Sequence, residues 1–103
     1  MFDKERINIV VSDMKNPDYE FLVAVHELIE AWLVRKRGIS EERITEFDIA
    51  FEKARPEDDL SEPGDEPDAP YQNEHCIATG VERILCAAMG IPWKEYDETV
   101  GNL

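Results

Sequence analysis

The segment "FLVAVHELIEAWLV", residues 21–34, decides the fold, because eleven of its fourteen residues are apolar. The three exceptions, His26, Glu27 and Glu30, are all ionisable. In a helix His26 and Glu30 lie one turn apart on the same face, about 6 Å along the axis, with Glu27 between them around the cylinder. This spacing predicts a helix that carries a pair of side chains able to hold a metal ion.

Local signals set the limits of this first helix. It is predicted to begin in "NPDYEF" (16–21), where Pro17 takes an early position, and to end at "RKRG" (35–38). There the basic side chains complement the dipole at the carboxyl end, and Gly38 supplies the cap.

The other elements follow from periodicity and punctuation. "RINIVVS" (6–12) predicts an N-terminal β-strand, whose pairing partner the sequence does not identify. Ser40 is an N-cap for a second helix. A third helix is expected over 71–90, and a short terminal helix over "IPWKEYDETVG" (91–101). The apolar stripes expected to form the core are Ile44, Phe47, Phe51 and Ala54 on the second helix, and Ile77, Val81, Ile84, Leu85 and Ala88 on the third.

The predicted fold is mainly α: a compact bundle of three core helices plus a short C-terminal helix, with the N-terminal strand. A chain of 103 residues with 43% hydrophobic content predicts a single domain, 1–103. Within it, the segment 56–70 contains four prolines and seven acidic residues, so it is interpreted as an acidic, Pro-rich surface loop.

Charge and hydropathy limit the partners. The 24 acidic and 11 basic residues give a formal charge of -13, which repels nucleic acid and anionic membranes. No apolar run approaches the ~20 residues of a membrane span, and the N-terminal run is too short for a signal peptide. The sequence therefore predicts a cytoplasmic protein that binds neither nucleic acid nor membrane and leaves a peptide or protein partner open.

Buried ionisable groups favour a metal site. Burying an ion costs several kcal/mol unless it is paired or ligated, and the basic residues of the first helix lie only at its far end. Both histidines of the chain, His26 and His75, fall on largely apolar helices. With Glu30, and with Asp48 as a fourth candidate, they form a ligand set for one divalent ion, Zn²⁺ first and iron or manganese otherwise.

The motif "HELIE" (26–30) resembles the H-E-x-x-H motif of zincin metallopeptidases, with Glu30 in place of the second histidine. More broadly, "VHELIEAW" with the downstream "PYQNEH" and "ER" is similar to small phage and bacterial proteins of the H-E-x-x-E kind, a family without an established activity. The zincin resemblance implies that His26 and Glu30 are metal ligands and that Glu27 is the general base of a hydrolase acting on a peptide or amide bond. Glu82 is predicted to orient His75 or another ligand from outside the coordination sphere.

Two other function classes stay open. One is a non-enzymatic, acidic helical module that binds a cationic protein and is stabilised by a structural metal or a buried ionic network. The other is a helical nucleotide pyrophosphohydrolase, which would place Glu27 and Glu30 on one helix and Glu82 on the next around magnesium. The sequence has no basic cluster for phosphate, which disfavours the second class.

Overall fold

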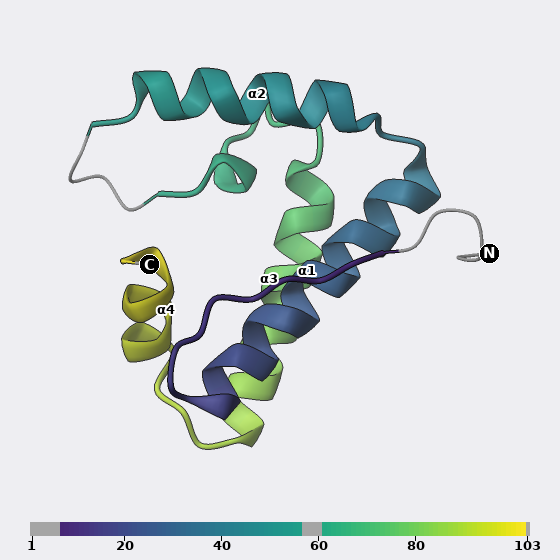
Figure 1. Cartoon of the computed structure of the whole chain (residues 1–103). Helices are drawn as coiled ribbons and strands as arrows, with labels where there is room; N and C mark the ends of the chain where they lie inside the picture. Colours follow the sequence, from purple (N-terminus) through teal and green to yellow (C-terminus); the bar gives the residue numbers. More distant parts are fainter. Residues whose placement is uncertain (1–6, 57–60, 103) are drawn as a thin grey trace.

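The chain is described by a computed structural model over residues 7–56 and 61–102. In these ranges it forms four α-helices and one short 3₁₀ helix (Figure 1). The elements are α1 (Pro17–Arg37), α2 (Glu41–Ala54), η1 (Pro63–Asp65), α3 (Gln72–Ala88) and α4 (Trp93–Gly101). The mainly helical prediction, with a short helix at the C-terminal end, is confirmed.

The predicted N-terminal strand is wrong for the residues that can be described. Residues 7–16 precede α1 without strand structure, and residue 6 of the predicted segment lies outside the described ranges. A β-strand needs a neighbouring strand to bond its backbone groups. The rest of the described chain is helix, turn and loop, so it offers no sheet edge to this β-branched segment.

Capping groups fix the ends of the two long helices near the N-terminus, and the predicted caps at Gly38 and Ser40 are confirmed. The Asn16 side chain accepts a hydrogen bond from the amide of Tyr19 at the start of α1, and Gly38 ends the helix in the left-handed conformation with φ 72°. The Ser40 hydroxyl accepts from the amide of Arg43 at the start of α2. These caps satisfy backbone groups that the helix itself leaves unpaired.

Helices α1 and α3 are the main packed pair and run antiparallel side by side (Figure 1). Arg37 at the end of α1 pairs with Glu74 at the start of α3, and Leu22 packs with Cys86 at the opposite end. Tyr96 of α4 completes this apolar cluster. Surrounding side chains that are partly buried against it are Tyr19, Val23, Leu85, Ile91, Trp93 and Val100.

The core face predicted for α3 is wrong in part. Ile77 and Ile84 are 46% and 69% exposed, whereas the buried residues of the helix are Glu74, His75, Ala78, Glu82 and Cys86. The central part of α1 is apolar except around His26, Glu27 and Glu30, so ion pairs across the interface help to decide which stripe of α3 turns inward. The mixed, polar stripe therefore meets α1. Of the predicted apolar stripe, Ile77, Ile84 and Ala88 are exposed, whereas Val81 and Leu85 are partly buried and Leu85 packs against the apolar cluster.

Helix α2 does not complete a three-helix bundle. It lies across the end of the α1–α3 pair, contacts η1 and has no buried residue (Figure 1). The described part of the acidic loop is not purely a surface segment, because η1 packs against α3 and both Gly64 and Ala69 are buried. Among the described residues, no helix has the length and apolar character needed to cross a bilayer.

Candidate metal centre

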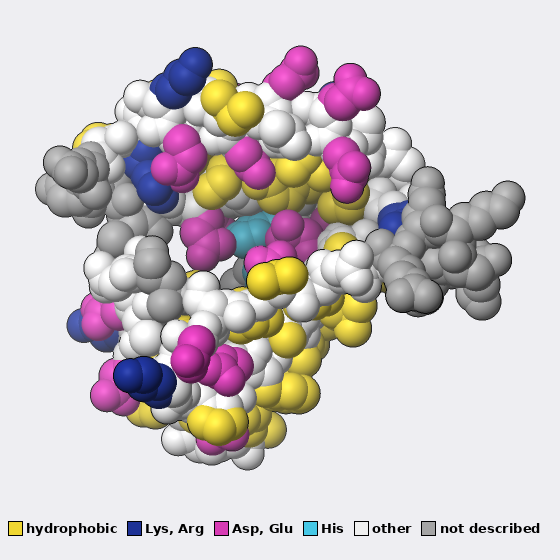
Figure 2. All heavy atoms as spheres, viewed as in Figure 1, with side chains coloured by type: hydrophobic (Ala, Val, Ile, Leu, Met, Phe, Trp, Pro, Cys, Tyr) yellow, Lys and Arg dark blue, Asp and Glu magenta, His cyan; other side chains and the backbone are white. Residues whose placement is uncertain are grey.

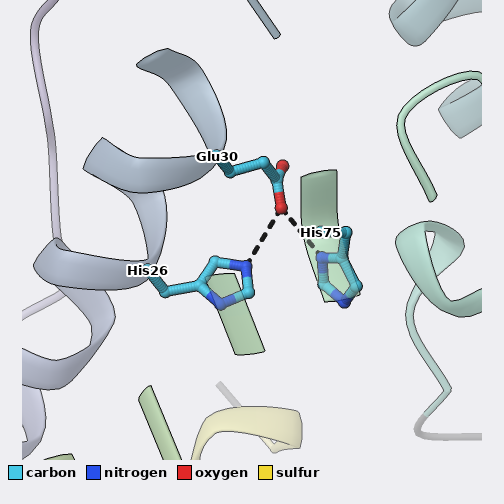
Figure 3. A group of neighbouring side chains, drawn as sticks. All are labelled: His26, Glu30 and His75. Carbon is cyan, nitrogen blue, oxygen red and sulfur yellow. Dashed lines mark hydrogen bonds and ion pairs between the residues drawn. The ribbon is translucent and has the colours of Figure 1, made fainter. Parts of the chain in front are cut away.

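Three side chains from two helices meet in the middle of the α1–α3 interface. His26 and Glu30 come from successive turns of α1, and His75 comes from the beginning of α3. One carboxylate oxygen of Glu30, Oε2, lies 3.0 Å from Nε2 of His26 and 2.8 Å from Nδ1 of His75 (Figure 3). The two imidazole rings stand edge to face with their centroids 4.9 Å apart. The structure thus brings together three of the four ligand candidates that the sequence suggested.

The second nitrogen of each imidazole also faces a carboxylate. Nδ1 of His26 lies 2.8 Å from Glu82 Oε1, and Nε2 of His75 lies 3.1 Å from Asp65 Oδ1. A carboxylate only accepts hydrogen bonds, and a neutral imidazole has a single N–H. Each contact therefore needs either a proton, carried by the ring nitrogen or by the carboxyl group, or a cation bound to both atoms.

Glu82 holds His26 in place and is itself held by α4. Its Oε2 accepts a hydrogen bond from the hydroxyl of Tyr96, and both residues are buried. Because Oε1 contacts His26, this carboxylate bridges α1 and α4 from α3. Glu82 thus orients the imidazole of His26 rather than that of His75, the first partner that sequence reasoning named.

The cluster is electrostatically coupled. Burial alone would lower the pKa of His26, but its hydrogen bonds to Glu30 and Glu82 outweigh burial and raise that pKa to about 10. Burial alone would raise the pKa of Glu30, but the bonds from both histidines lower it to about 2. The pKa of His75 is also raised, because its bond to Glu30 outweighs burial. These shifts share one cause, because the carboxylates around the two rings favour positive charge between them.

A cavity of about 110 Å³ opens beside the two histidines. In Figure 2 a histidine ring is visible in a hollow of the surface with acidic side chains around it. Glu27 lines this cavity, and burial raises its pKa. The other residues lining it are Val23, His26, Glu62, Asp65, His75, Thr79, Glu82, Trp93, Tyr96, Asp97 and Val100. No lysine or arginine belongs to this lining in the described chain.

Asp48, the fourth ligand suggested by the sequence, is not brought to the cluster. Its Oδ1 accepts a hydrogen bond from the hydroxyl of Tyr71 at 2.5 Å. The ring of Tyr71 in turn stands edge to face with His75, with the centroids 6.5 Å apart. Burial and the Asp48 contact raise the pKa of Tyr71. Asp48 therefore reaches the site only through this tyrosine.

Sequence reasoning missed Glu62, Asp65 and Tyr96. The two acids belong to the loop 56–70, whose charges have no periodicity that would single out any one of them. The available signal was the loop itself, because a long acidic segment directly before a histidine-bearing helix is placed to fold over that histidine. Nothing in the sequence pattern indicated that the hydroxyl of Tyr96 would bond to Glu82.

Three of these side chains have the spacing of residues that could hold a divalent ion. The ligand atoms of His26, Glu30 and His75 all lie within 4.8 Å of one another. Bonds of about 2.0–2.1 Å in a tetrahedral zinc site place ligand atoms roughly 3.3–3.4 Å apart, a few tenths of an ångström beyond the contacts of Glu30 with the two rings. No family model, no curated protein and no solved structure matches the chain.

Proposed function

We propose that this protein binds a divalent metal ion, zinc first, through His26, Glu30 and His75, in a site of zincin-like character. The observation that carries the proposal is the single oxygen of Glu30 contacted by both histidines of the chain. His26 and Glu30 are one helical turn apart, and the third ligand arrives from a helix 45 positions further along the chain. A nitrogen and carboxylate set of this kind suits Zn²⁺, or iron or manganese.

The charge around the site supports the same proposal. Five acidic residues line the cavity, and Glu30 adjoins them, without a lysine or arginine in the described lining. Even two protonated histidines leave these six carboxylates in excess. A divalent ion bound by three of the side chains would offset that excess at its centre.

The proposed activity is hydrolysis of a peptide or amide bond. A divalent ion in such a site supplies Lewis-acid chemistry and lowers the pKa of coordinated water toward ~7. Glu27 lines the same cavity as His26 and His75, which supports the proposal that its carboxylate takes a proton from the attacking water. That proton then passes to the departing amine, while the oxygen of water bonds to the carbonyl carbon. His26 is held for its role by the carboxylate of Glu82.

Metal content tests the site. Protein purified without added metal and then dialysed against Zn²⁺ is compared with His26→Ala, His75→Ala and the double variant by elemental analysis. Each single substitution removes one of three ligands and should lower zinc affinity by about a hundredfold or more. Cys76→Ala is the matched control, because this exposed thiol neighbours His75 but lies outside the cluster. Full zinc occupancy in the double variant would overturn the proposed site.

Glu27→Gln tests the proposed base. The amide keeps the shape of the side chain but cannot accept the proton, so hydrolysis should be abolished while zinc content is retained. A peptide-library cleavage screen on zinc-loaded protein compares wild type, this variant and Glu46→Gln, an exposed position on α2. Equal turnover by wild type and Glu27→Gln removes Glu27 from the mechanism, and no turnover by wild type contradicts the hydrolase proposal.

A second candidate function is a non-enzymatic module stabilised by a buried ionic network. The contacts of the two histidines favour this candidate, because each of the four imidazole nitrogens has a carboxylate partner. Two imidazolium rings can therefore pair with these carboxylates without a metal. Such a protein would bind no zinc above the level of the double histidine variant and would keep its full stability in a chelator.

A further inference from the structure

Asp65 and Glu62 form a second group of possible ligands on the far side of the His75 ring. Nδ1 of His75 faces Glu30, whereas Nε2 lies 3.1 Å from Asp65 Oδ1 and 3.5 Å from Glu62 Oε1. The ligand atoms of Glu62, Asp65 and His75 all lie within 4.8 Å of one another. We propose that these three residues hold a second divalent cation, so that His75 bridges two ions.

The loop is shaped to approach the imidazole closely. Gly64 is buried, and a Cβ atom at this position would lie 2.4 Å from Cγ of His75, far inside van der Waals contact. Only glycine therefore lets the backbone of η1 sit against the ring. The two carboxylates flank this glycine in the sequence, and the close approach places both of them near Nε2.

The charge balance leaves room for a second ion. The cluster contains six carboxylates, from Glu30 and the five acids of the cavity lining. One divalent ion offsets two of these charges, and the described lining contributes no basic side chain. A cation at Glu62 and Asp65 would offset two more charges, at the carboxylates that the first ion does not touch.

Bridging has a definite chemical requirement. A ring nitrogen that coordinates a metal must have lost its proton, so ligation through both Nδ1 and Nε2 leaves His75 without either N–H. The released protons go to the solvent. With metal–nitrogen bonds of about 2.0 Å, the two ions would lie about 6 Å apart across the ring. The inference extends the proposed function and rests on it for the role of Nδ1.

Zinc stoichiometry of the full chain tests this inference. Equilibrium dialysis against Zn²⁺ followed by elemental analysis should give two ions per wild-type chain and one per chain of the double variant Glu62→Gln, Asp65→Asn. The matched control is Glu66→Gln with Asp68→Asn, which removes two charges from the same loop outside the cluster. The control should keep two ions. Circular dichroism verifies that all three proteins remain helical.

The outcomes separate this inference from the proposed function. A single ion in wild type that remains in the Glu62→Gln, Asp65→Asn variant overturns the second site and leaves the first intact. Loss of an ion in the control variant also overturns it, because binding would then follow loop charge rather than ligand geometry. A chain with His26→Ala that keeps one ion, lost on adding the two loop substitutions, supports the second site even if the first fails.

Discussion

One end and the middle of the α1–α3 interface are held by different forces. At one end Leu22, Cys86 and Tyr96 form an apolar cluster in which each residue is at most 1% exposed. In the middle, His26 and His75 meet carboxylates at every ring nitrogen. The apolar contact depends on area and shape, whereas the polar contact depends on which atom faces which.

The difference explains how a small domain can hold so many buried charges. Apolar burial stabilises the helix pair without the titration of any group, so pH has little effect on it. The charged groups of the polar centre lose their hydration, and this cost is offset only if each charged atom finds a partner. The contribution of the centre to stability therefore depends on protons or metal ions in solution. The apolar end therefore holds the helices together while the middle remains available for binding.

Leu22→Ala should produce the largest loss of stability and should affect the apolar end alone. Leu22 is fully buried, so the loss of its side chain leaves a cavity that is expected to destabilise the protein by about 3–5 kcal/mol. Urea denaturation with excess zinc measures this change in the free energy of unfolding. Leu28→Ala is the matched control, because Leu28 lies on the same helix but is 47% exposed.

The control should lose less than about 1 kcal/mol, and the folded fraction of Leu22→Ala should still bind zinc with wild-type stoichiometry. If both leucine variants were destabilised equally, the apolar cluster would not be the stabilising end of the interface.

The pH dependence of stability should come from the polar centre of the metal-free protein. The folded-state pKa of His26 is raised from 6.5 to about 10, so its contribution is complete below pH 6.5 and lost as pH rises toward 10. The pKa of Glu30 is lowered from 4.5 to about 2, so its contribution is complete above pH 4.5 and lost as pH falls toward 2. Stability should therefore peak between pH 4.5 and 6.5.

Thermal melting in a chelator measures this dependence. Between pH 6 and pH 8.5 the metal-free protein should lose about 2 kcal/mol, which corresponds to a fall in Tm of roughly 10 °C for a domain of this size. Saturating zinc is the control, because metal ions compete best for deprotonated ligands and their binding strengthens with pH. A metal-free Tm that stays constant over this range would contradict the pairing of His26 with Glu30 and Glu82.

Features that depend on neighbouring residues could be predicted from the sequence, whereas features that depend on contacts across the interface could not. The caps at Gly38 and Ser40 and the His26–Glu30 spacing are local features, so the neighbouring residues suffice to predict them. The inward face of α3 depends on its partner across the interface, and its exposed Ile77 and Ile84 were wrongly assigned to the core. Apolar periodicity favours one stripe, but pairing with His26 and Glu30 turns the polar stripe inward.

The two loop acids near His75 could not be identified from sequence patterns, for a related reason. Glu62 and Asp65 are two of seven acids in the segment 56–70, and their selection depends on how Gly64 seats the backbone on the His75 ring. That contact joins residues on different elements and leaves no periodic trace. Asp48 differs from these two acids, because it was a ligand candidate from the sequence, whereas its carboxylate contacts Tyr71 in the structure.

Tyr96→Phe should produce the smallest loss of stability. This variant distinguishes the two regions, because the side chain of Tyr96 takes part in both. The ring of Tyr96 belongs to the apolar cluster, and its hydroxyl donates to Glu82 in the polar centre. Phenylalanine keeps the ring but leaves one carboxylate oxygen of Glu82 without its donor, at an expected cost of about 1–2 kcal/mol. Urea denaturation measures this loss, with Tyr19→Phe as the control, since the Tyr19 ring packs edge to face on Tyr96.

The position of Glu82 gives this variant a second readout. Without the Tyr96 hydroxyl, Glu82 can rotate away from Nδ1 of His26, so the orientation of that imidazole is less restrained and zinc affinity should fall by about tenfold. Competition with a chromophoric chelator at fixed pH measures the affinity. Tyr96→Phe could instead lose stability but keep wild-type zinc affinity. Tyr96 would then stabilise the apolar end alone, and Glu82 would restrain His26 without its contact to α4.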